Sequence, residues 1–326
     1  MSLTFDIEQP RLGVWRTGNT GVEGVWHFEA DEPGPVVMIS CLIHGNELCG
    51  AWAVKRLLES GLRPRRGALT LAFCNLAAFD RFDRANHDAS RFVEEDMNRQ
   101  WSEQRLAHAD SVERTRAAQL RPFVERADWL LDLHSMHEPG PPLLLTGPHR
   151  RAVEFAAVLN GVPHIVHDAG HADGVRMRDF GRFGLPDGSA DARTALLVEC
   201  GFHGDPSSIS VAQDVCYRFL LNTGTVEQDA LLTDLPDWQR PASISPKVLE
   251  VQGAVVAKDE NFCFVRALQP LETIPRAGSV IGLNRDEWVE TPFDNCVLVM
   301  PSTRQARAGV TVVRYARQLT LEEFSK

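Results

Sequence analysis

The segment that decides the fold class is Pro35-Val-Val-Met-Ile-Ser-Cys-Leu-Ile43, followed directly by His44-Gly45-Asn46-Glu47. A run this apolar is typical of a strand buried on both faces of a sheet. A helix is predicted directly after it, ending near Gly61. Its apolar side would be formed by Leu48, Ala51, Trp52, Val54, Leu57 and Leu58. A buried strand that leads into a helix is the unit from which α/β sheets are built.

The same alternation of strand and helix continues along most of the chain. Further strands are predicted at 68–74, 129–133, 142–146, 164–167 and 194–198. Helices are predicted over 103–127, 150–159 and from 207 through 220, with an irregular polar loop at 81–99. Strands that alternate with helices indicate an α/β fold with a mixed, largely parallel sheet between helices.

The pattern changes after the proline-rich stretch 235–246, which is typical of a linker. Short β-type runs follow, separated by Gly, Pro and Asn, at 248–257, 262–267, 279–283, 296–300 and 310–315. We therefore predict a catalytic domain at 1–234, a linker at 235–246 and a small all-β domain at 247–326. The all-β domain is expected to cover the sheet edge as an active-site lid.

Composition and charge narrow the class of protein. A formal net charge of −10 over 326 residues argues against nucleic-acid binding, which needs a basic surface. The sequence has neither an apolar run long enough for a transmembrane helix nor a signal-peptide pattern, so we expect a cytoplasmic protein without a membrane partner. The seven cysteines form no Cys-x-x-Cys pair, which favours reduced, buried thiols. A cysteine nucleophile would lack any flanking signature.

Polar residues stand at the ends of three predicted strands: His44 with Glu47, His134, and Glu199. Because the carboxyl ends of parallel strands line the crevice of an open α/β sheet, we expect these groups to converge. Two histidines and a carboxylate with one open position form the ligand set of a catalytic zinc, although cobalt, manganese or iron would also fit. Asp132 would orient the His134 imidazole from behind.

Each of these motifs also has an ordinary structural interpretation. A single His-x-x-Glu is mostly a solvated pair, and Glu199 after an apolar run would serve equally as a helix cap. The joint pattern favours a metal site, because a buried sheet edge rarely gathers uncompensated charge.

Four motifs together resemble the succinylglutamate desuccinylase and aspartoacylase family of the zinc-carboxypeptidase-like clan. They are His44-Gly-Asn-Glu47, Arg91-Phe-Val-Glu-Glu-Asp-Met-Asn98-Arg99, Asp132-Leu-His134 and Val198-Glu199-Cys-Gly201. Their order and spacing match over residues 44–201, and the trailing β-domain fits in kind. The resemblance implies a zinc-carboxypeptidase-like fold.

The resemblance also implies a role for each matching residue. One zinc ion per chain would be bound by His44, Glu47 and His134. Glu199 would act as general base toward the attacking water and then protonate the leaving amine. Arg91 would stabilise the oxyanion, and Asn98 with Arg99 would hold a substrate carboxylate. The ordinary alternative for both arginines is a surface ion pair with Glu94, Glu95 or Asp96.

The chain departs from the family in one respect. Related deacylases place a tyrosine of the C-terminal domain near the substrate, but this sequence has only Tyr217 and Tyr315, and neither falls between 288 and 295. A further arginine cluster precedes the Glu199 strand, formed by Arg176, Arg178 and Arg182. Substrate binding by Arg176 and Arg178 and a solvated loop are both compatible with the sequence.

We therefore predict a zinc-dependent amidohydrolase that acts on a linear amide, with a small carboxylate-bearing N-acyl amino acid or N-acyl amine as substrate. A metallocarboxypeptidase acting on short peptides is the alternative enzyme, and an inactive metal-binding or scaffolding protein is the alternative without catalysis. The lid favours the deacylase, because carboxypeptidases need an open groove. Assembly into a homo-oligomer is compatible with the sequence, which identifies neither the acyl group nor the amine.

Overall fold

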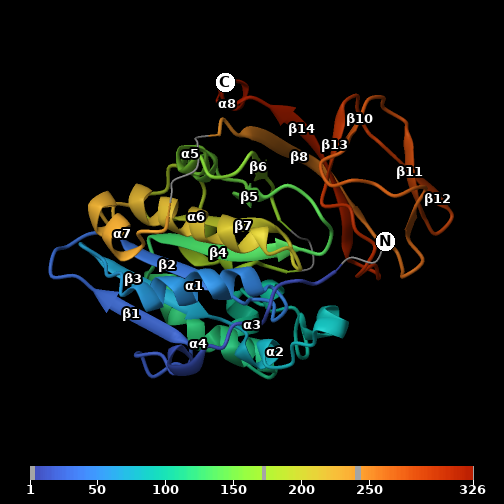
Figure 1. Cartoon of the computed structure of the whole chain (residues 1–326). Coiled ribbons are helices and arrows are strands. Elements are labelled where there is room, and N and C mark those ends of the chain that lie inside the picture. The colour runs from blue at the N-terminus through green and yellow to red at the C-terminus, as the bar shows by residue number, and fades with distance from the viewer. Residues whose placement is uncertain (1–3, 171–173, 239–243, 326) are drawn as a thin grey trace.

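The computed structural model describes residues 4–170, 174–238 and 244–325. Within them, eleven strands form one sheet in the order β1-β3-β2-β4-β7-β5-β6-β8-β14-β13-β10 (Figure 1). In chain order these strands are β1 Val25–Glu29, β2 Val36–Cys41, β3 Ala68–Phe73, β4 Trp129–Met136, β5 Leu143–Leu145, β6 His164–His167, β7 Thr194–Phe202, β8 Lys247–Val256, β10 Thr273–Ile274, β13 Cys296–Val299 and β14 Thr311–Leu319. A second, antiparallel sheet contains β9 Cys263–Phe264, β11 Val280–Asn284 and β12 Glu287–Glu290.

The middle of the large sheet is parallel. Strands β3, β2, β4 and β7 run side by side in the same direction, whereas β1 joins β3 and β5 joins β7 in antiparallel fashion. This arrangement confirms the predicted mixed α/β class. The carboxyl ends of β2, β4 and β7 consequently meet at one edge of the sheet.

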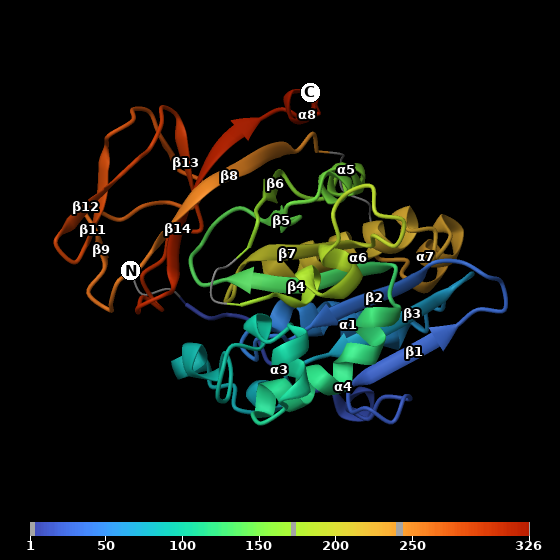
Figure 2. The ribbon, with the colours of Figure 1, turned by 180° about the vertical axis from the view of Figure 1, so that it is seen from behind.

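Helices cover both faces of this sheet, as the two opposite views show (Figures 1 and 2). Helices α1 and α6 pack together on one face, whereas α3 and α4 lie on the other. The α-helices are α1 Leu48–Ser60, α2 Leu76–Phe79, α3 Glu103–Ala107, α4 Val112–Arg126, α5 Arg150–Leu159, α6 Ser207–Asn222, α7 Gln228–Asp234 and α8 Leu321–Phe324. Short 3-10 helices occur at Gly13–Arg16, Arg84–Ser90, Met97–Arg99, Met177–Asp179 and Gly181–Gly184.

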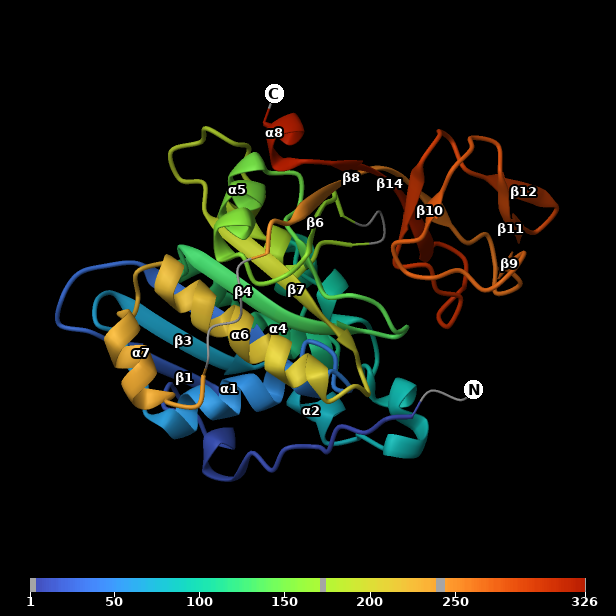
Figure 3. The same ribbon diagram turned by 45° about the horizontal axis from the view of Figure 1, so that its top comes forward.

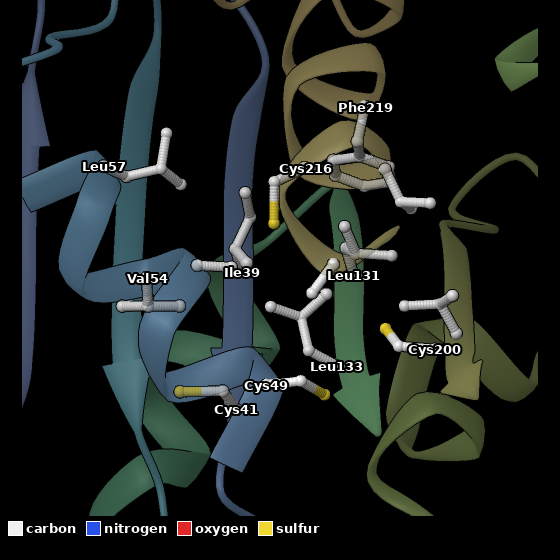
Figure 4. Close-up of a cluster of buried hydrophobic side chains, with 14 of the residues drawn as sticks. Ile39, Cys41, Cys49, Val54, Leu57, Leu131, Leu133, Cys200, Cys216 and Phe219 are labelled. Carbon is white, nitrogen blue, oxygen red and sulfur yellow. The ribbon is translucent and has the colours of Figure 1, made fainter. Parts of the chain in front are cut away.

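The main core lies between the sheet and the α1–α6 layer. Figure 4 shows Ile39 of β2 and Leu131 of β4 beside Val54 of α1 and Phe219 of α6, and all four side chains are fully buried. This packing explains why the 35–43 segment is apolar at nearly every position. Six of the cysteines are buried as small apolar residues. The expectation of buried thiols is wrong for Cys263, which is exposed on the short strand β9.

Three predicted elements need correction. The single helix predicted at 103–127 is divided into α3 and α4, because Ser111 caps the second helix by accepting a hydrogen bond from the Arg114 N–H. Strands β4 and β7 also extend further than predicted, so that His134 and Glu199 lie within the strands and not after them. The apolar pattern stops at the polar residues near the ends of β4 and β7, so this pattern underestimates the length of both strands.

The C-terminal strands continue the large sheet. Strand β8 pairs with β6 in parallel, and β14, β13 and β10 extend the sheet beyond it before the second sheet projects away from the main body (Figure 3). The three-part domain division stays a prediction, and residues 239–243 of the predicted linker lie outside the described residues. In the described parts of the chain, no helix is both long and apolar enough to cross a membrane.

Candidate active site

The turn that follows β2 carries the first two candidate metal ligands. It begins at Leu42, a fully buried residue with a φ of 57°, a backbone angle that branched and bulky residues rarely adopt. A side chain at Gly45 would collide with backbone, since a Cβ there would lie 2.3 Å from the carbonyl carbon of Ala78. The turn therefore needs glycine between His44 and Glu47, as the His-Gly-Asn-Glu segment provides.

The structure brings His44, Glu47 and His134 together at the carboxyl edge of the sheet. The Nδ1 atom of His44 lies 2.7 Å from Oε1 of Glu47, and the Nδ1 atom of His134 lies 2.8 Å from Oε2 of the same carboxylate. One ligand atom from each residue lies within 4.8 Å of the other two, and all three side chains are buried. These are the three residues that the sequence predicts as metal ligands.

The outer nitrogens of both imidazoles are held by carboxylates. Asp132 lies 2.8 Å from Nε2 of His134, as the alternation along β4 predicts, and Asp96 lies 3.0 Å from Nε2 of His44. A carboxylate behind each histidine fixes the ring orientation and leaves Nδ1 available, which is the usual support of metal-binding histidines. The donor set therefore fits a divalent ion such as zinc. The sequence does not reveal this role of Asp96, which was expected only as an ion-pair partner of Arg91 or Arg99.

The electrostatics of this cluster favour positive charge. Burial alone would raise the pKa of Glu47, but the imidazoles of His44 and His134 hold it well below its usual range. Burial alone would lower the pKa of His134, but the carboxylates of Asp132 and Glu47 raise it well above its usual range. Three carboxylates, two of them fully buried, around two imidazoles thus stabilise cationic charge at this point.

Glu199 stands beside His134 on the neighbouring strand, because these two residues pair in register between β4 and β7. The register shifts directly after His134, an irregularity of the kind that often re-aims side chains next to active sites. The Oε2 atom of Glu199 is buried and has no hydrogen-bond partner among the described residues. Burial, with the nearby Glu47 carboxylate, raises the pKa of Glu199 well above its usual range. A carboxylate that readily takes up a proton is suited to general acid–base work.

Arg91 points into the same cluster from the loop at 91–99. Its Nη1 atom donates to Oε1 of Glu47 over 3.2 Å, and its Nη2 atom donates to Oδ2 of Asp96 over 3.4 Å. This ion pair between Arg91 and Asp96 is the ordinary alternative to a catalytic role that the sequence allows for Arg91. The pair does not lie at the surface, however, because both side chains are largely buried. A guanidinium held this way offers positive charge beside the candidate metal ligands.

Asn98 and Arg99 lie on the rim of the same cavity. The Oδ1 atom of Asn98 accepts a hydrogen bond of 3.1 Å from the backbone N–H of Met177, which ties the 91–99 loop to the segment carrying Arg176. Arg99 donates to the backbone carbonyl of Asn98 and also lines the cavity. The predicted pair is therefore placed where it can meet a substrate.

Of the two predicted substrate-binding arginines in the 176–182 cluster, one lines the cavity and the other does not. Arg176 lines the cavity, is buried, and pairs with Asp179 over 2.6 Å and with Asp168 over 3.5 Å. Arg178 is equally buried but is absent from the cavity wall, and it donates to the backbone carbonyl of Ala195. Neither belongs to a solvated loop. Substrate binding by either arginine stays a prediction, and only Arg176 has the position for it.

Side chains from the N-terminal and the C-terminal parts of the chain line one cavity of about 550 Å³. This volume lies within the range that suits small-molecule ligands. From the catalytic side it is lined by His44, Glu47, Arg91, Asn98, Arg99, His134, Arg176 and Glu199. From the C-terminal side it is lined by Met300, Ser302, Gln305, Arg307, Val310, Thr311 and Arg314.

Among the residues that the structure describes, no tyrosine lines this cavity. The C-terminal wall instead includes Arg314 of β14, whose Nε atom lies 3.0 Å from Oδ2 of Asp168. No local pattern marks Arg314, because its neighbours in sequence form an ordinary strand.

Asp179 allows a test of the buried arginines. It pairs with Arg176 and also lies 3.0 Å from Nη1 of Arg178. Burial raises the pKa of Asp179, but these two arginines outweigh burial and lower it. Asp179→Asn should therefore destabilise the protein at pH 7 by about 3–5 kcal/mol, because it leaves buried positive charge uncompensated.

A lowered folded-state pKa means that this stabilisation is present above the unfolded pKa, about 3.9, and is lost as pH falls through the folded value. Urea unfolding of both proteins at pH 7 and at pH values well below 3.9 should therefore show the difference in unfolding free energy between the two proteins narrowing in acid. A difference that is constant with pH would contradict this assignment.

The fold and the site together define an α/β protein with a His-Glu-His group that could hold a metal ion, and with a buried carboxylate beside it, at the carboxyl edge of its sheet. The family model of the succinylglutamate desuccinylase/aspartoacylase catalytic domain matches residues 33–159 of this chain. The match confirms the resemblance seen in the motifs and includes His44, Glu47 and His134. Glu199 lies beyond the matched residues.

Solved structures share the fold along most of the chain. The succinylglutamate desuccinylase of Vibrio cholerae is 16% identical, with a TM-score of 0.67 over 91% of this chain and 86% of the other. That of Vibrio parahaemolyticus is 18% identical, with a TM-score of 0.64 over 91% and 87%. Murine aminoacylase 3 is 17% identical, with a TM-score of 0.56 over 89% and 97%. No curated protein matches this sequence.

Proposed function

We propose that this protein is a zinc-dependent amidohydrolase that removes the acyl group from a small, carboxylate-bearing N-acyl amino acid or related amine. The observation that carries the proposal is the relation of Glu199 to the metal-binding group. A buried carboxylate oxygen without a partner faces the same cavity as His44, Glu47 and His134. A protein that only stores a metal needs no such group, so this observation also argues against a scaffolding role.

The residues of the chain divide the chemistry among them. His44, Glu47 and His134 would hold a zinc ion, which would supply Lewis-acid chemistry by polarising the substrate carbonyl and lowering the pKa of water. Glu199 takes the proton of the attacking water and then passes it to the leaving nitrogen. Arg91 donates hydrogen bonds to the oxyanion that forms when the carbonyl is attacked.

Substrate binding falls to the residues around the rim. Asn98 and Arg99 hold a substrate carboxylate, and Arg176, which lines the same cavity, binds a second anionic group. Burying a carboxylate against fixed arginines orients the scissile amide relative to Glu199, which lowers the entropic part of the barrier.

The C-terminal wall of the cavity favours a deacylase over a carboxypeptidase. Arg304 lies 2.7 Å from Glu138, and Gln305 lies 3.2 Å from His137, so the 300–310 segment is fastened across the catalytic side. A peptide chain would need an open groove at this point, whereas a small N-acyl amino acid fits within a cavity of about 550 Å³.

A hydrolysis screen tests the proposed function. Zinc-loaded protein should be offered N-acetyl, N-formyl and N-succinyl amino acids, together with short unblocked peptides, and the released amines should be measured. We expect release from one or more of the N-acyl amino acids and little from the peptides. Preferential cleavage of peptides would favour the metallocarboxypeptidase, and inactivity toward every substrate would contradict the proposal.

Arg99→Met tests the carboxylate clamp. The substitution should raise KM strongly and also lower turnover, because remote binding energy positions the scissile bond. Esterifying the substrate carboxylate should impair the wild type and make little further difference to the variant. Arg121→Met, which removes a surface arginine of α4 paired with Glu103 and Glu125, is the matched control and should have no effect. Additive losses from esterification and Arg99→Met would assign Arg99 another role.

A further inference from the structure

Glu113 is a fully buried carboxylate outside the catalytic cavity, in the first turn of α4. Among the described residues, no lysine, arginine or histidine is paired with it. A buried charge without a counter-ion is costly unless hydrogen bonds satisfy it. Its surroundings therefore need an explanation that the proposed chemistry does not supply.

The carboxylate is satisfied by neutral N–H groups, three of which belong to consecutive residues of one loop. The backbone N–H groups of Val93, Glu94 and Glu95 donate to it over 2.7, 3.2 and 3.3 Å. The side-chain amide of Asn75, two residues after the end of β3, donates to it over 3.0 Å. Hydrogen bonds to an ionised acceptor are roughly twice as strong as neutral ones.

The loop returns the contact to the helix. The Glu94 carboxylate accepts from the backbone N–H of Val112, the first residue of α4, over 2.7 Å. The Glu95 carboxylate pairs with Arg114 over 2.8 Å. Groups of the loop thus donate hydrogen bonds to the start of α4, and groups at the start of α4 donate to the loop. Helix α4 itself packs against the sheet.

This loop is the one that carries the proposed chemistry. Arg91 stands two residues before the three bound N–H groups, and Asp96, Asn98 and Arg99 follow directly after them. Arg91 contacts Glu47, and Asp96 contacts His44, so a shift of the loop would displace groups on both ligand-bearing residues.

We propose that Glu113 is a positioning residue that fixes the 91–99 loop against the metal-binding group. It does not touch the cavity, and it acts by holding three backbone amides between the oxyanion arginine and the carboxylate clamp. The kinetic part of this inference rests on the proposed hydrolase function, whereas the conformational part does not.

The conformational part is tested first in the unaltered protein by hydrogen exchange. The amides of Val93, Glu94 and Glu95 belong to no helix or strand, yet they should exchange slowly because Glu113 holds them. In Glu113→Gln, the amide nitrogen would face other donors, and exchange at these three positions should accelerate about 10- to 100-fold. Glu113→Asp keeps the charge and should give an intermediate effect.

Glu125→Gln is the matched control, because Glu125 lies on the same helix but makes an exposed ion pair with Arg121. It should leave exchange in the loop unchanged. Fast exchange of the three amides in the wild type, or unchanged exchange in both Glu113 variants, would overturn the proposal. The wild-type measurement decides the matter even if Glu113→Gln does not fold.

Kinetics separate positioning from a general loss of folded protein. With the N-acyl amino acid that the wild type hydrolyses best, Glu113→Gln should raise KM and lower kcat/KM about 10- to 100-fold. A smaller active fraction would lower the apparent kcat and leave KM unchanged, and that result would overturn the catalytic part. If the wild type hydrolyses no substrate, the proposed function fails alone, and the exchange experiment still decides the role of Glu113.

Discussion

Glu199→Gln should retain zinc and bind substrate nearly normally, while its turnover falls by about two to four orders of magnitude. The change keeps the size of the side chain and removes the group that accepts a proton, and general acid–base groups typically contribute this much. Glu199 lies beside His134 on β7, but its free oxygen is not among the three ligand atoms that cluster together. Steady-state kinetics and elemental analysis of the same preparation provide both measurements.

The pH profile gives an independent check on Glu199. A general base must be deprotonated, so the wild-type rate should fall as acid protonates the carboxylate, and this acidic limb should disappear in Glu199→Gln. Glu154→Gln, which removes a surface carboxylate of α5 paired with Arg150, is the control and should behave as wild type. Loss of zinc from Glu199→Gln would make this residue a ligand, and retained activity would assign the base to another group.

His134→Ala should have the opposite signature: loss of zinc and, with it, loss of hydrolysis. The imidazole supplies one of three clustered ligand atoms, and two remaining ligands cannot hold the ion as three do. We expect about one zinc per chain in the wild type and far less in the variant after dialysis. Elemental analysis measures this directly.

The control for His134→Ala is a histidine elsewhere in the same sheet. His164 lies on β6 and does not line the cavity, so His164→Ala should keep its zinc. Stoichiometric zinc in His134→Ala would show that the ligand set has been wrongly assigned. Added zinc at high concentration should restore part of the activity only if the remaining residues stay in place, which circular dichroism can verify.

The local part of the fold was accessible from the sequence, because periodicity reports what each segment buries. The apolar run at 35–43 became β2, and the helical spacing after it became α1, which ends at Gly61 in the left-handed conformation. The ends of β4 and β7 were less accessible, because His134 and Glu199 interrupt the apolar pattern while the strands continue.

The sequence by itself determined that the candidate metal ligands meet at one place, because parallel strands of one sheet present their carboxyl ends together. His44, Glu47 and His134 could be grouped on that ground although 90 positions separate the first from the last. The family motifs added expected roles for Arg91 and Glu199 that periodicity cannot supply.

Only the tertiary structure decided which distant groups support the site. No local signal marks three of these groups: Asp96 behind His44, Arg314 in the cavity wall, and Glu113 beneath the 91–99 loop. A lone charged residue has the same sequence pattern whether it is solvated or buried. Their positions depend on how separate segments pack, and packing is set by contacts between residues far apart in the chain. The same reason explains why the pairing of β8 with β6, which makes one sheet of two predicted regions, was visible only in the folded protein.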